Sequence, residues 1–416
     1  MAENQPPRQP LTGPEPASGD RQGTLLVVNC GSSTLKLALF DLRLHKIASV
    51  LAEKLEQFQA TAHIQGDPAP VPLPSHASHR QALEAVIQAL FERGWLTQAP
   101  VAIGHRVVHG GERFRQAVRI DDRTREAIAD CASLAPLHNP VNLAGIDSTR
   151  SLFPGVPQIA VFDTAFHQTL PPRAFLYALP QRFYRQWGVR RYGFHGTSHA
   201  FMLTETARLL GQLPEQTSLI SAHLGNGCSI AAIDHGHSVD TSMGLTPLEG
   251  LVMGSRSGDV DPGLFDFLKT KGIGQDELHR ILNEQSGLLG LSGQSNDMRT
   301  LCELADQGHE ASATAIDVFC FRLARYIGAM MASLRRLDAL VFTGGIGENS
   351  ARIRRQTLAS LGLLGFAVDP ERNSAHGRQS HGHIESGASR FPVLVIATDE
   401  ERVIAGESLR LATPHT

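Results

Sequence analysis

Three glycine-rich turns are the first residues in the chain that could do chemistry. Each follows an apolar run typical of a strand, and the turns are 31–34, 225–227 and 343–349. Glycine has no Cβ, so backbone N–H groups in such turns can approach an anion closely, and a following helix adds the positive end of its dipole. A single glycine turn usually only reverses the chain. Because three such turns each follow a predicted strand, the sequence favours phosphate binding and simple chain reversal equally for them.

Two common phosphate-binding signatures are missing. The sequence has no Gly-Lys pair, which excludes the G-x-x-x-x-G-K-[ST] loop. It also lacks the D-F-G and H-R-D motifs of protein kinases. If the chain binds a nucleotide, it therefore uses another architecture.

Two arginines and one aspartate stand beside turn-forming residues. Arg106 lies in the segment 104–112 and Arg256 in the segment 253–262, and both segments contain glycines. Arginine binds carboxylates and phosphates in planar, bidentate geometry, so both could hold an anion. Either could instead be a solvated loop arginine. Asp163 follows an apolar strand-like run, where open α/β sheets bind ligands, and its alternative role is to cap a helix.

His195 and His199 are four residues apart. On one helix this spacing could ligate zinc, but the glutamate of the H-E-x-x-H motif is absent and Gly196 would break the first turn. Ser198 is a suitable helix N-cap for the run 200–210. The G-x-S-x-G elbow of serine hydrolases is also absent. Two other roles are favoured for His195: a donor in an active site, or a packed histidine.

Two similar hairpins position the first two glycine turns. Residues 25–29 and 35–39 are typical of strands around the first turn, and 219–224 and 229–234 of strands around the second. Each hairpin ends in an aspartate. Their like design predicts a duplicated α/β domain with a cleft between the copies, although similar hairpins also arise by chance.

The third turn lies in an alternation of strands and helices near the C-terminus. The run 313–334 has apolar residues at helical spacing, 340–342 is a short buried strand, and a helix follows from Ser350. The order recurs with the strand 393–396, the acidic turn 399–401 and a terminal helix. This alternation predicts central sheets covered by helices on both faces.

Length and charge limit the class of protein. At about 150 residues per domain, 416 residues predict two or three domains. The net charge of −3 makes the chain weakly acidic, whereas nucleic-acid-binding proteins usually carry a basic surface.

Five scattered cysteines without a C-x-x-C pair favour a reducing compartment. No apolar stretch approaches about 18 residues, so no membrane contact is predicted. The proline-rich residues 1–22 are expected to be a disordered tail, and the protein to be cytoplasmic.

Together these segments resemble a known family. Residues 29–36 (Asn-Cys-Gly-Ser-Ser-Thr-Leu-Lys) are similar to the opening signature of acetate kinases, and 191–199 (Arg-Tyr-Gly-Phe-His-Gly-Thr-Ser-His) to their second signature. The resemblance covers nearly the whole chain from about residue 24, and an ordered set of this length is highly specific. In the family's order, the further matching segments are 104–111, 135–140, 161–167, 223–227, 253–262, 297–299, 343–349 and 398–401.

The resemblance implies a fold and a reaction. The fold is the actin/hexokinase/Hsp70-like one: an α/β architecture of two RNase-H-like domains, with mixed central sheets covered by helices and the active-site cleft between the lobes. The expected domains are 23–165, completed by the C-terminal helix 399–416, and 166–398, which binds the nucleotide and forms a homodimer. The reaction is reversible, direct in-line transfer of the γ-phosphoryl group of ATP to acetate with Mg²⁺ or Mn²⁺, giving acetyl phosphate and ADP.

The resemblance also implies roles residue by residue. Two residues are expected at the metal site, Asn29 and Glu400. The residues expected to contact the nucleotide are Lys36, His223, Leu224, Gly225, Asn226, Gly227, Asp297, Met298, Arg299, Gly345, Ile346, Gly347, Glu348 and Asn349. The acetate carboxylate is expected on Arg106, and its methyl group in a small apolar pocket made by Val108, Leu137, Phe194 and Pro247. The expected catalytic residues are Asp163, His195 and Arg256.

The chemistry accounts for these residue types. Acetate is already an anionic nucleophile near neutral pH, so the protein must bring two anions together and screen the charge on the transferred group. Arg106 would hold the acceptor, while Arg256 and His195 would contact the equatorial oxygens. Asp163 would orient an arginine or a metal-bound water. One departure from the family pattern bears on this site: Asp399 replaces the usual asparagine and adds a negative charge near the expected metal.

Three alternative functions remain open on the sequence. A propionate or butyrate kinase would share every charged residue and differ in the width of the pocket. A non-catalytic nucleotide-binding module of the same fold would lack the acceptor arginines, yet Arg106 and Arg256 are both present. A zinc hydrolase would use His195 and His199.

Overall fold

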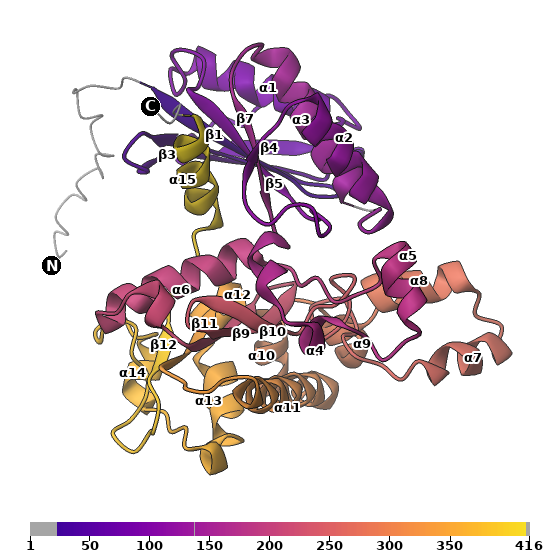
Figure 1. Ribbon diagram of the computed structural model, residues 1–416, viewed down its shortest axis with the longest axis vertical. Coiled ribbons are helices and arrows are strands. Elements are labelled where there is room, and N and C mark those ends of the chain that lie inside the picture. Colours follow the sequence, from indigo (N-terminus) through magenta and orange to yellow (C-terminus); the bar gives the residue numbers. More distant parts are fainter. Residues whose placement is uncertain (1–22, 137, 413–416) are drawn as a thin grey trace, which may run out of the picture.

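The computed structural model describes residues 23–136 and 138–412 (Figure 1). The expected tail at residues 1–22 and the expected pocket residue Leu137 lie outside the described residues. The described chain forms two lobes, each built around one sheet. None of its helices is long and apolar enough to cross a membrane.

The first lobe contains a seven-stranded sheet. Its strands are β1 (Thr24–Cys30), β2 (Leu35–Asp41), β3 (Lys46–Glu53), β4 (Thr61–Ile64), β5 (Ala102–Val107), β6 (Val118–Arg119) and β7 (Gln158–Phe162). Their order in the sheet is β4–β3–β2–β1–β5–β7–β6. β1, β2 and β3 are antiparallel neighbours, whereas β5 and β7 run parallel to β1. Because β1 is central and buried on both faces, it is an unbroken apolar run from Leu25 to Val28.

The second lobe contains a five-stranded sheet with the same topology. Its strands are β8 (Leu219–Leu224), β9 (Cys228–Asp234), β10 (His237–Thr241), β11 (Ala339–Thr343) and β12 (Val393–Val395). The order β10–β9–β8–β11–β12 again joins three antiparallel strands to two parallel ones, as β3–β2–β1–β5–β7 does. The duplicated α/β domain predicted from the two hairpins is therefore confirmed.

Helices cover both sheets, as the alternation of strands and helices predicted. The α-helices of the first lobe are α1 (His79–Glu92), α2 (Asp122–Asp130), α3 (Asn139–Leu152) and α15 (Glu400–Ala412). Those of the second lobe are α4 (Pro172–Phe175), α5 (Gln181–Trp187), α6 (Gly196–Leu210), α7 (Gly263–Thr270), α8 (Gln275–Glu284), α9 (Gly287–Ser292), α10 (Met298–Asp306), α11 (Glu310–Ala332), α12 (Gly344–Asn349), α13 (Ala351–Ala359) and α14 (Pro370–Ser374). Short 3₁₀ turns occur at Cys131–Ser133, Ala165–Thr169, Pro214–Gln216 and Gly362–Leu364.

The C-terminal helix α15 packs on the N-terminal sheet (Figure 1). Alternate residues of β1 point to opposite faces of that sheet. Leu26 belongs to the hydrophobic cluster under α1, and Leu25 belongs to the hydrophobic cluster under α15. α15 comes close to β5 because position 104 is glycine. A Cβ built on Gly104 would lie 2.6 Å from Cγ2 of Ile404. Two ends of the sequence thus form one core.

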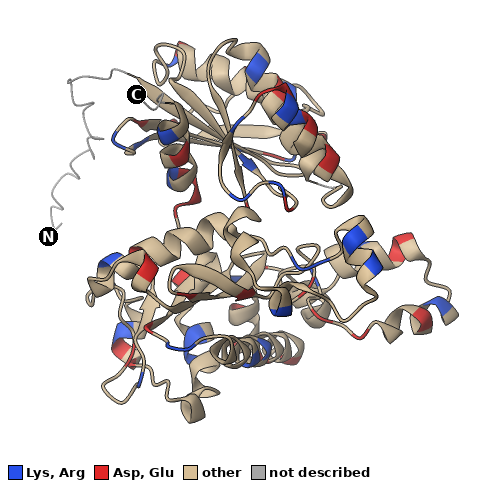
Figure 2. Ribbon diagram, in the orientation of Figure 1, with Lys and Arg blue, Asp and Glu red and all other residues tan. Residues whose placement is uncertain are grey.

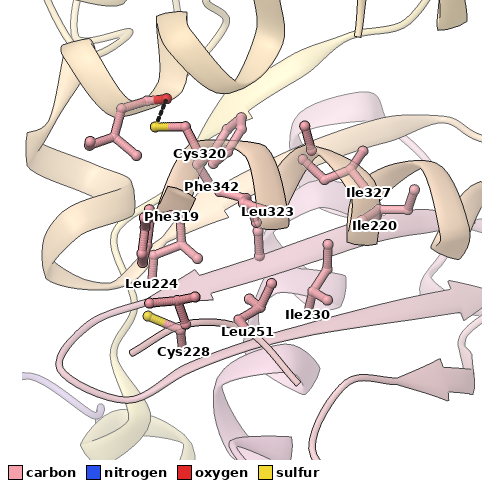
Figure 3. Packing of buried hydrophobic residues seen from close by; sticks show 14 of the residues in the cluster. Ile220, Leu224, Cys228, Ile230, Leu251, Phe319, Cys320, Leu323, Ile327 and Phe342 are labelled. Atoms are coloured by element: carbon pink, nitrogen blue, oxygen red, sulfur yellow. Dashed lines mark hydrogen bonds between the residues drawn. The ribbon is translucent and has the colours of Figure 1, made fainter. Parts of the chain in front are cut away.

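The second sheet is enclosed by α11 and α6. Phe319, Leu323 and Ile327 of α11 belong to one core cluster with Ile220 of β8 and Phe342 of β11 (Figure 3). α6 covers the opposite face. The helical run predicted over 313–334 is therefore confirmed, although α11 starts and ends slightly earlier than that run.

Two local predictions are wrong. α6 begins at Gly196 rather than after Ser198, because His195 adopts left-handed backbone (φ 55°) and directly precedes the helix. The segment after β11 is the helix α12 and not an open glycine turn. Gly344 makes the reversal with φ +77°, and a Cβ there would lie 2.8 Å from the carbonyl oxygen of Leu224.

Candidate active site

A cleft of about 620 Å³ lies between the two lobes. The first sheet and the start of α15 contribute Asn29, Lys36, Lys46, Arg106, Asp399, Glu400, Glu401 and Ile404. The second lobe and the segment before α15 contribute His195, His223, Gly225, Asn226, Gly227, Gly344, Gly345, Glu348 and Thr398. Figure 2 shows the acidic start of α15 where the chain crosses from one lobe to the other. The cleft therefore combines cationic and acidic groups.

A second cavity, of about 860 Å³, adjoins the cleft on the second lobe. The two spaces share Gly225, Asn226 and Gly345. The other lining residues of the second cavity are Asn296, Asp297, Met298, Arg299, Cys302, Glu303, Asp306, Ile346, Asn349, Ser350, Ala351 and Arg352. Two joined spaces of this kind suit an elongated ligand whose ends differ in chemistry.

Arg106 and Asp163 form a bidentate pair at the edge of the cleft. Nε of Arg106 donates to Oδ1 of Asp163 at 3.0 Å, and Nη2 donates to Oδ2 at 2.6 Å. Arg106 is in β5 and Asp163 follows β7, and because these parallel strands are neighbours, their carboxyl ends meet at one edge of the sheet. The prediction that Asp163 lies at a ligand-binding strand end is consistent with this position. Its alternative role as a helix cap is wrong, because both oxygens accept from Arg106.

The charge of this pair follows from its geometry. Burial raises the pKa of Asp163 above its usual value, and the charge of Arg106 opposes that shift. Burial alone would lower the pKa of Arg106, but the charges of Asp163 and Glu400 outweigh burial and raise it. Because both carboxyl oxygens accept N–H bonds, we assign Asp163 as ionised and Arg106 as protonated.

Arg256 of the second lobe lies against Gly227, which lines the cleft. Its Nη1 donates to the carbonyl oxygen of Pro247 at 2.5 Å. A Cβ built on Gly227 would lie 2.4 Å from Nη2 of Arg256 and 3.4 Å from Cε1 of His195, so these three residues form one contact group. Burial, and further the charge of Arg106, lower the pKa of Arg256. Within the described part of the chain Arg256 pairs with no carboxylate, which leaves its charge available to an anion.

Four histidines form a layer behind the cleft: His167, His195, His199 and His223. Burial lowers the pKa of all four, to about 4 for His167 and His223. The rings are therefore neutral near pH 7. Nδ1 of His223 lies 2.8 Å from Oγ of Ser198, which is inside α6 and does not cap it. The ring centroids of His195 and His223 are 4.4 Å apart, and both rings line the cleft.

Acidic side chains complete the cleft. Oε1 of Glu348 accepts from the backbone N–H of Gly344 at 2.9 Å and so holds the N-terminus of α12. Lys46 pairs with Glu401 at 2.8 Å and with Asp399 at 3.6 Å. The extra negative charge that the sequence places at Asp399 is therefore offset by Lys46.

The oxygen donors of the cleft fit a hard divalent cation. Asn29 and Glu400 both line the cleft, and amide and carboxylate oxygens are ligands that Mg²⁺ prefers. Among residues 23–136 and 138–412, no three His, Cys, Asp or Glu side chains converge as a metal site. Mg²⁺ commonly binds through one or two carboxylates together with water and substrate phosphates. This donor set therefore fits an ion that is held jointly with a nucleotide.

The zinc alternative does not fit the geometry. Nδ1 of His199 contacts Oγ of Ser221, and its Nε2 contacts Oγ of Ser229, each at 2.9 Å. Both ring nitrogens of His199 are therefore occupied by hydroxyl groups. His195 precedes the helix that carries His199, so the two histidines do not have the helical i, i+4 spacing that the zinc alternative requires.

Comparison with known proteins places the chain in a family. The profile of the Acetokinase family matches residues 24–406. The chain belongs to this family. Among similar acetokinases, the acetate kinase of Ectopseudomonas mendocina is 51% identical over 395 residues, which cover 93% of this chain and 98% of the relative.

Solved structures of the acetokinase family agree with the fold. A propionate kinase from Francisella tularensis has a TM-score of 0.88 at 42% identity, covering 94% of this chain and 100% of that chain. The acetate kinase of Porphyromonas gingivalis has a TM-score of 0.87 at 37% identity, with the same two coverages. The two-lobed α/β fold expected from the resemblance is confirmed.

Most residues expected to contact the nucleotide line the cleft or the adjoining cavity. These are Lys36, His223, Gly225, Asn226, Gly227, Asp297, Met298, Arg299, Gly345, Ile346, Glu348 and Asn349. Two others line neither space. The side chain of Leu224 is fully buried in the core because it ends the central strand β8, and Gly347 is buried within α12. Asp297 and Arg299 pair with each other at 2.9 Å at the cavity edge.

Two described residues of the expected methyl pocket are buried. Val108 is 8% exposed and Phe194 is 1% exposed, and both belong to the second-lobe core cluster. Pro247 is half-buried, and its carbonyl oxygen accepts a hydrogen bond from Arg256.

Three residues near the arginines were missed by sequence reasoning. His138 lies close enough for Arg256 and Arg106 to lower its pKa, in addition to burial. The backbone N–H of Thr398 donates to Glu348 at 3.0 Å. His138 and Thr398 lie in segments that match the family, but no spacing singled them out. No sequence motif singled out Lys46, because its position in the cleft depends on how β3 pairs with β2.

Proposed function

We propose that the protein catalyses reversible transfer of the γ-phosphoryl group of ATP to acetate, giving acetyl phosphate and ADP. The observation that carries this proposal is that Arg106 and the neutral ring of His195 line one cleft, with Arg256 packed against its Gly227, and that this cleft adjoins a larger cavity. A carboxylate oxygen attacks the γ-phosphorus, and the bond from that phosphorus to the β–γ bridging oxygen breaks. Acetate is an anion near neutral pH, so no side chain has to remove a proton from it.

Arg106 is proposed to hold the acetate carboxylate. Asp163 occupies Nε and one N–H of Nη2, which leaves both N–H groups of Nη1 and the second N–H of Nη2 as donors for a ligand in the cleft. The same bonds fix the plane of the guanidinium. Asp163 then acts by orienting Arg106, because both of its oxygens are already engaged.

Arg256 and His195 are proposed to contact the transferred phosphoryl group. Arg256 supplies charge, and neutral His195 supplies an N–H donor to an equatorial oxygen. Lys36 would contact the nucleotide phosphates, as expected from the resemblance. Mg²⁺ or Mn²⁺, held by Asn29, Glu400 and those phosphates, would screen the charge of the β- and γ-oxygens.

Propionate or butyrate is the second candidate acceptor, because one similar solved structure is a propionate kinase. Acetate is favoured because a relative that is 51% identical over 395 residues is an acetate kinase. One methylene is worth only about 1–3 kcal/mol, so some activity with propionate is expected. Steady-state kinetics with the three acids separate the candidates, and a higher kcat/KM for the longer acids would reverse the assignment.

We propose that a homodimer forms through the second lobe. Phe321 of α11 is 56% exposed and Leu291 of α9 is 41% exposed, and both line a groove of about 530 Å³ with Val252 and Val318. Exposed apolar surface of this kind commonly marks a protein–protein contact. The proposed domains are 23–165 with 399–416, and 166–398.

We also propose a cytoplasmic location. All five cysteines are unpaired, which fits a reducing compartment. No role in nucleic-acid binding is proposed, because the chain is weakly acidic.

The decisive experiment is a hydroxamate assay for acetyl phosphate on the purified protein. Arg256→Ala is expected to lower kcat by about 10²–10³, the usual cost of losing one electrostatic contact to the transition state. Arg208→Ala is a matched control, because Arg208 is exposed on α6 and, among the described residues, forms an ion pair only with neighbouring Glu205. Equal activity in Arg256→Ala and the unaltered protein would refute the role given to Arg256.

A further inference from the structure

A line of four hydrogen-bonded side chains runs from the core of the second sheet to the cleft. Oγ of Ser221 lies 2.9 Å from Nδ1 of His199, and Nε2 of His199 lies 2.9 Å from Oγ of Ser229. The same Ser229 oxygen lies 2.9 Å from Nδ1 of His195. Ser221, His199 and Ser229 are fully buried, on β8, α6 and β9. Three packed elements therefore fix this line in place.

One arrangement pairs the hydrogens of the three fully buried side chains and leaves unpaired only the ring N–H of His195, the residue that lines the cleft. Each neutral ring carries one N–H, and each serine carries one O–H. Among the described residues, the hydroxyl of Ser221 has no acceptor except Nδ1 of His199, so the proton of His199 is on Nε2. That N–H donates to Ser229, whose own hydroxyl then donates to Nδ1 of His195. The proton of His195 is thereby assigned to Nε2.

The reverse arrangement is unfavourable at both ends of the line. It would leave the Ser221 hydroxyl hydrogen unpaired in the core, and buried polar groups are almost always hydrogen-bonded. At the other end it would turn an unprotonated Nε2 of His195 toward an anionic phosphoryl group. An arrangement in which Ser229 accepts from both rings would leave its own hydrogen unpaired.

His167 provides a contrasting case in the same histidine layer. Its Nε2 lies 3.0 Å from the carbonyl oxygen of Phe194, and its Nδ1 lies 2.8 Å from Oγ of Ser238. A carbonyl oxygen can only accept, so His167 is protonated on Nε2 whatever Ser238 does. Ser238 therefore resembles Ser229 in burial and in its histidine partner but has no part in setting a tautomer.

We propose that Ser229 and His199 are positioning residues that hold His195 in its Nε2-protonated form, with that N–H available to the transferred phosphoryl group. The inference rests on the proposed donor role of His195. Nδ1 of His195 is held by Ser229, and its Nε2 bonds to no described residue, so Nε2 is the nitrogen left for a ligand. A free neutral imidazole populates both tautomers, and only one of them can donate from this nitrogen.

The test compares Ser229→Ala with Ser238→Ala in the full-length protein. The readouts are kcat and KM for ATP and acetate, and long-range ¹H–¹⁵N correlation spectra of the histidine rings, in which the two tautomers have different nitrogen shifts. Ser229→Ala is expected to lower kcat by at least about tenfold with KM for ATP within about threefold, because His195 loses the contact that fixes both its tautomer and the orientation of its ring, and the N–H that it presents acts in the transition state. The His195 signals, identified by their loss in His195→Gln, are expected to change from the Nε2–H pattern to a mixture. Ser238→Ala is expected to leave the pattern and kcat nearly unchanged.

The outcomes separate this inference from the proposed function. Full activity in His195→Gln would refute the donor role itself. A large loss in His195→Gln, with unaltered kcat and an unaltered Nε2–H pattern in Ser229→Ala, would overturn the positioning role alone. Equal losses in Ser229→Ala and Ser238→Ala without a change of the His195 pattern would also overturn it, because they would indicate a general packing effect.

Discussion

Gly227→Ala is expected to abolish most activity without unfolding the protein. The added Cβ would lie 2.4 Å from Nη2 of Arg256, whereas an ordinary contact begins near 3.4 Å, so the guanidinium must move by about 1 Å. A displacement of that size in a reacting group can cost about 100-fold in rate, which corresponds to about 2.7 kcal/mol. The shift would also disturb the hydrogen bond to Pro247.

The fold should tolerate this change. Gly227 is absent from the glycines with positive φ, so alanine can adopt its backbone conformation. The assay measures kcat for acetyl phosphate formation together with the thermal unfolding midpoint. Gly328→Ala is the matched control, because its Cβ would meet only Cδ1 of Leu364 at an ordinary 3.5 Å within α11. If Gly227→Ala keeps kcat within about threefold of the unaltered protein, the packing of Arg256 against this turn does not matter for the reaction.

Two further predictions concern buried charge. Asp163→Asn keeps the shape of the pair but removes the nearer of the two carboxylates that face Arg106 and leaves Glu400 at 3.9 Å, so the free energy of unfolding is expected to fall by about 3 kcal/mol and kcat/KM for acetate to fall with it. Denaturant unfolding and kinetics check this, and unaltered stability would contradict the ionised pair. His105, His167 and His223 have pKa values of about 4 against an ordinary 6.5, chiefly because of burial. At these three positions alone the unfolded chain binds up to three more protons between these values, so stability is expected to fall as pH drops from about 6.5 to about 4, by up to about 4 kcal/mol per pH unit from these groups. Urea midpoints that stay constant between pH 7 and pH 5 would contradict this.

Elements with a strong local signal could be predicted from the sequence. The apolar runs of β1 and β8, and the glycine turns that follow them, were placed correctly. The helix expected from Ser350 also exists, with the Ser350 side chain accepting from the N–H of Ile353. In each case the deciding contacts lie within a few residues of one another.

The start of α6 could not be predicted, because its cause is a contact between lobes. Glycine normally weakens a helix, and Gly196 therefore argued against one there. The backbone N–H of Gly196 donates to the carbonyl oxygen of Asp163 at 2.9 Å, and a Cβ on Gly196 would lie 2.2 Å from that oxygen. The close approach of the helix to the first lobe outweighs the cost of glycine.

The candidate site was predictable in its residue types but not in its pairings. Arg106 and Asp163 were each singled out, yet their bidentate contact depends on β5 and β7 being neighbours in the sheet. The pairing of Lys46 with Asp399 joins residues more than three hundred positions apart. Such contacts depend on strand order and on the return of the C-terminal helix, and neither leaves a local pattern.

The return of α15 to the first sheet has a consequence for biosynthesis. One face of that sheet, including the surface around Gly104, receives its covering helix from residues 400–412, which the ribosome adds after every strand of both sheets. The N-terminal lobe therefore cannot reach its final form until α15 has been made, whereas every strand of the second sheet has been made by residue 395. The nascent protein must keep the uncovered strands from associating with other chains until then.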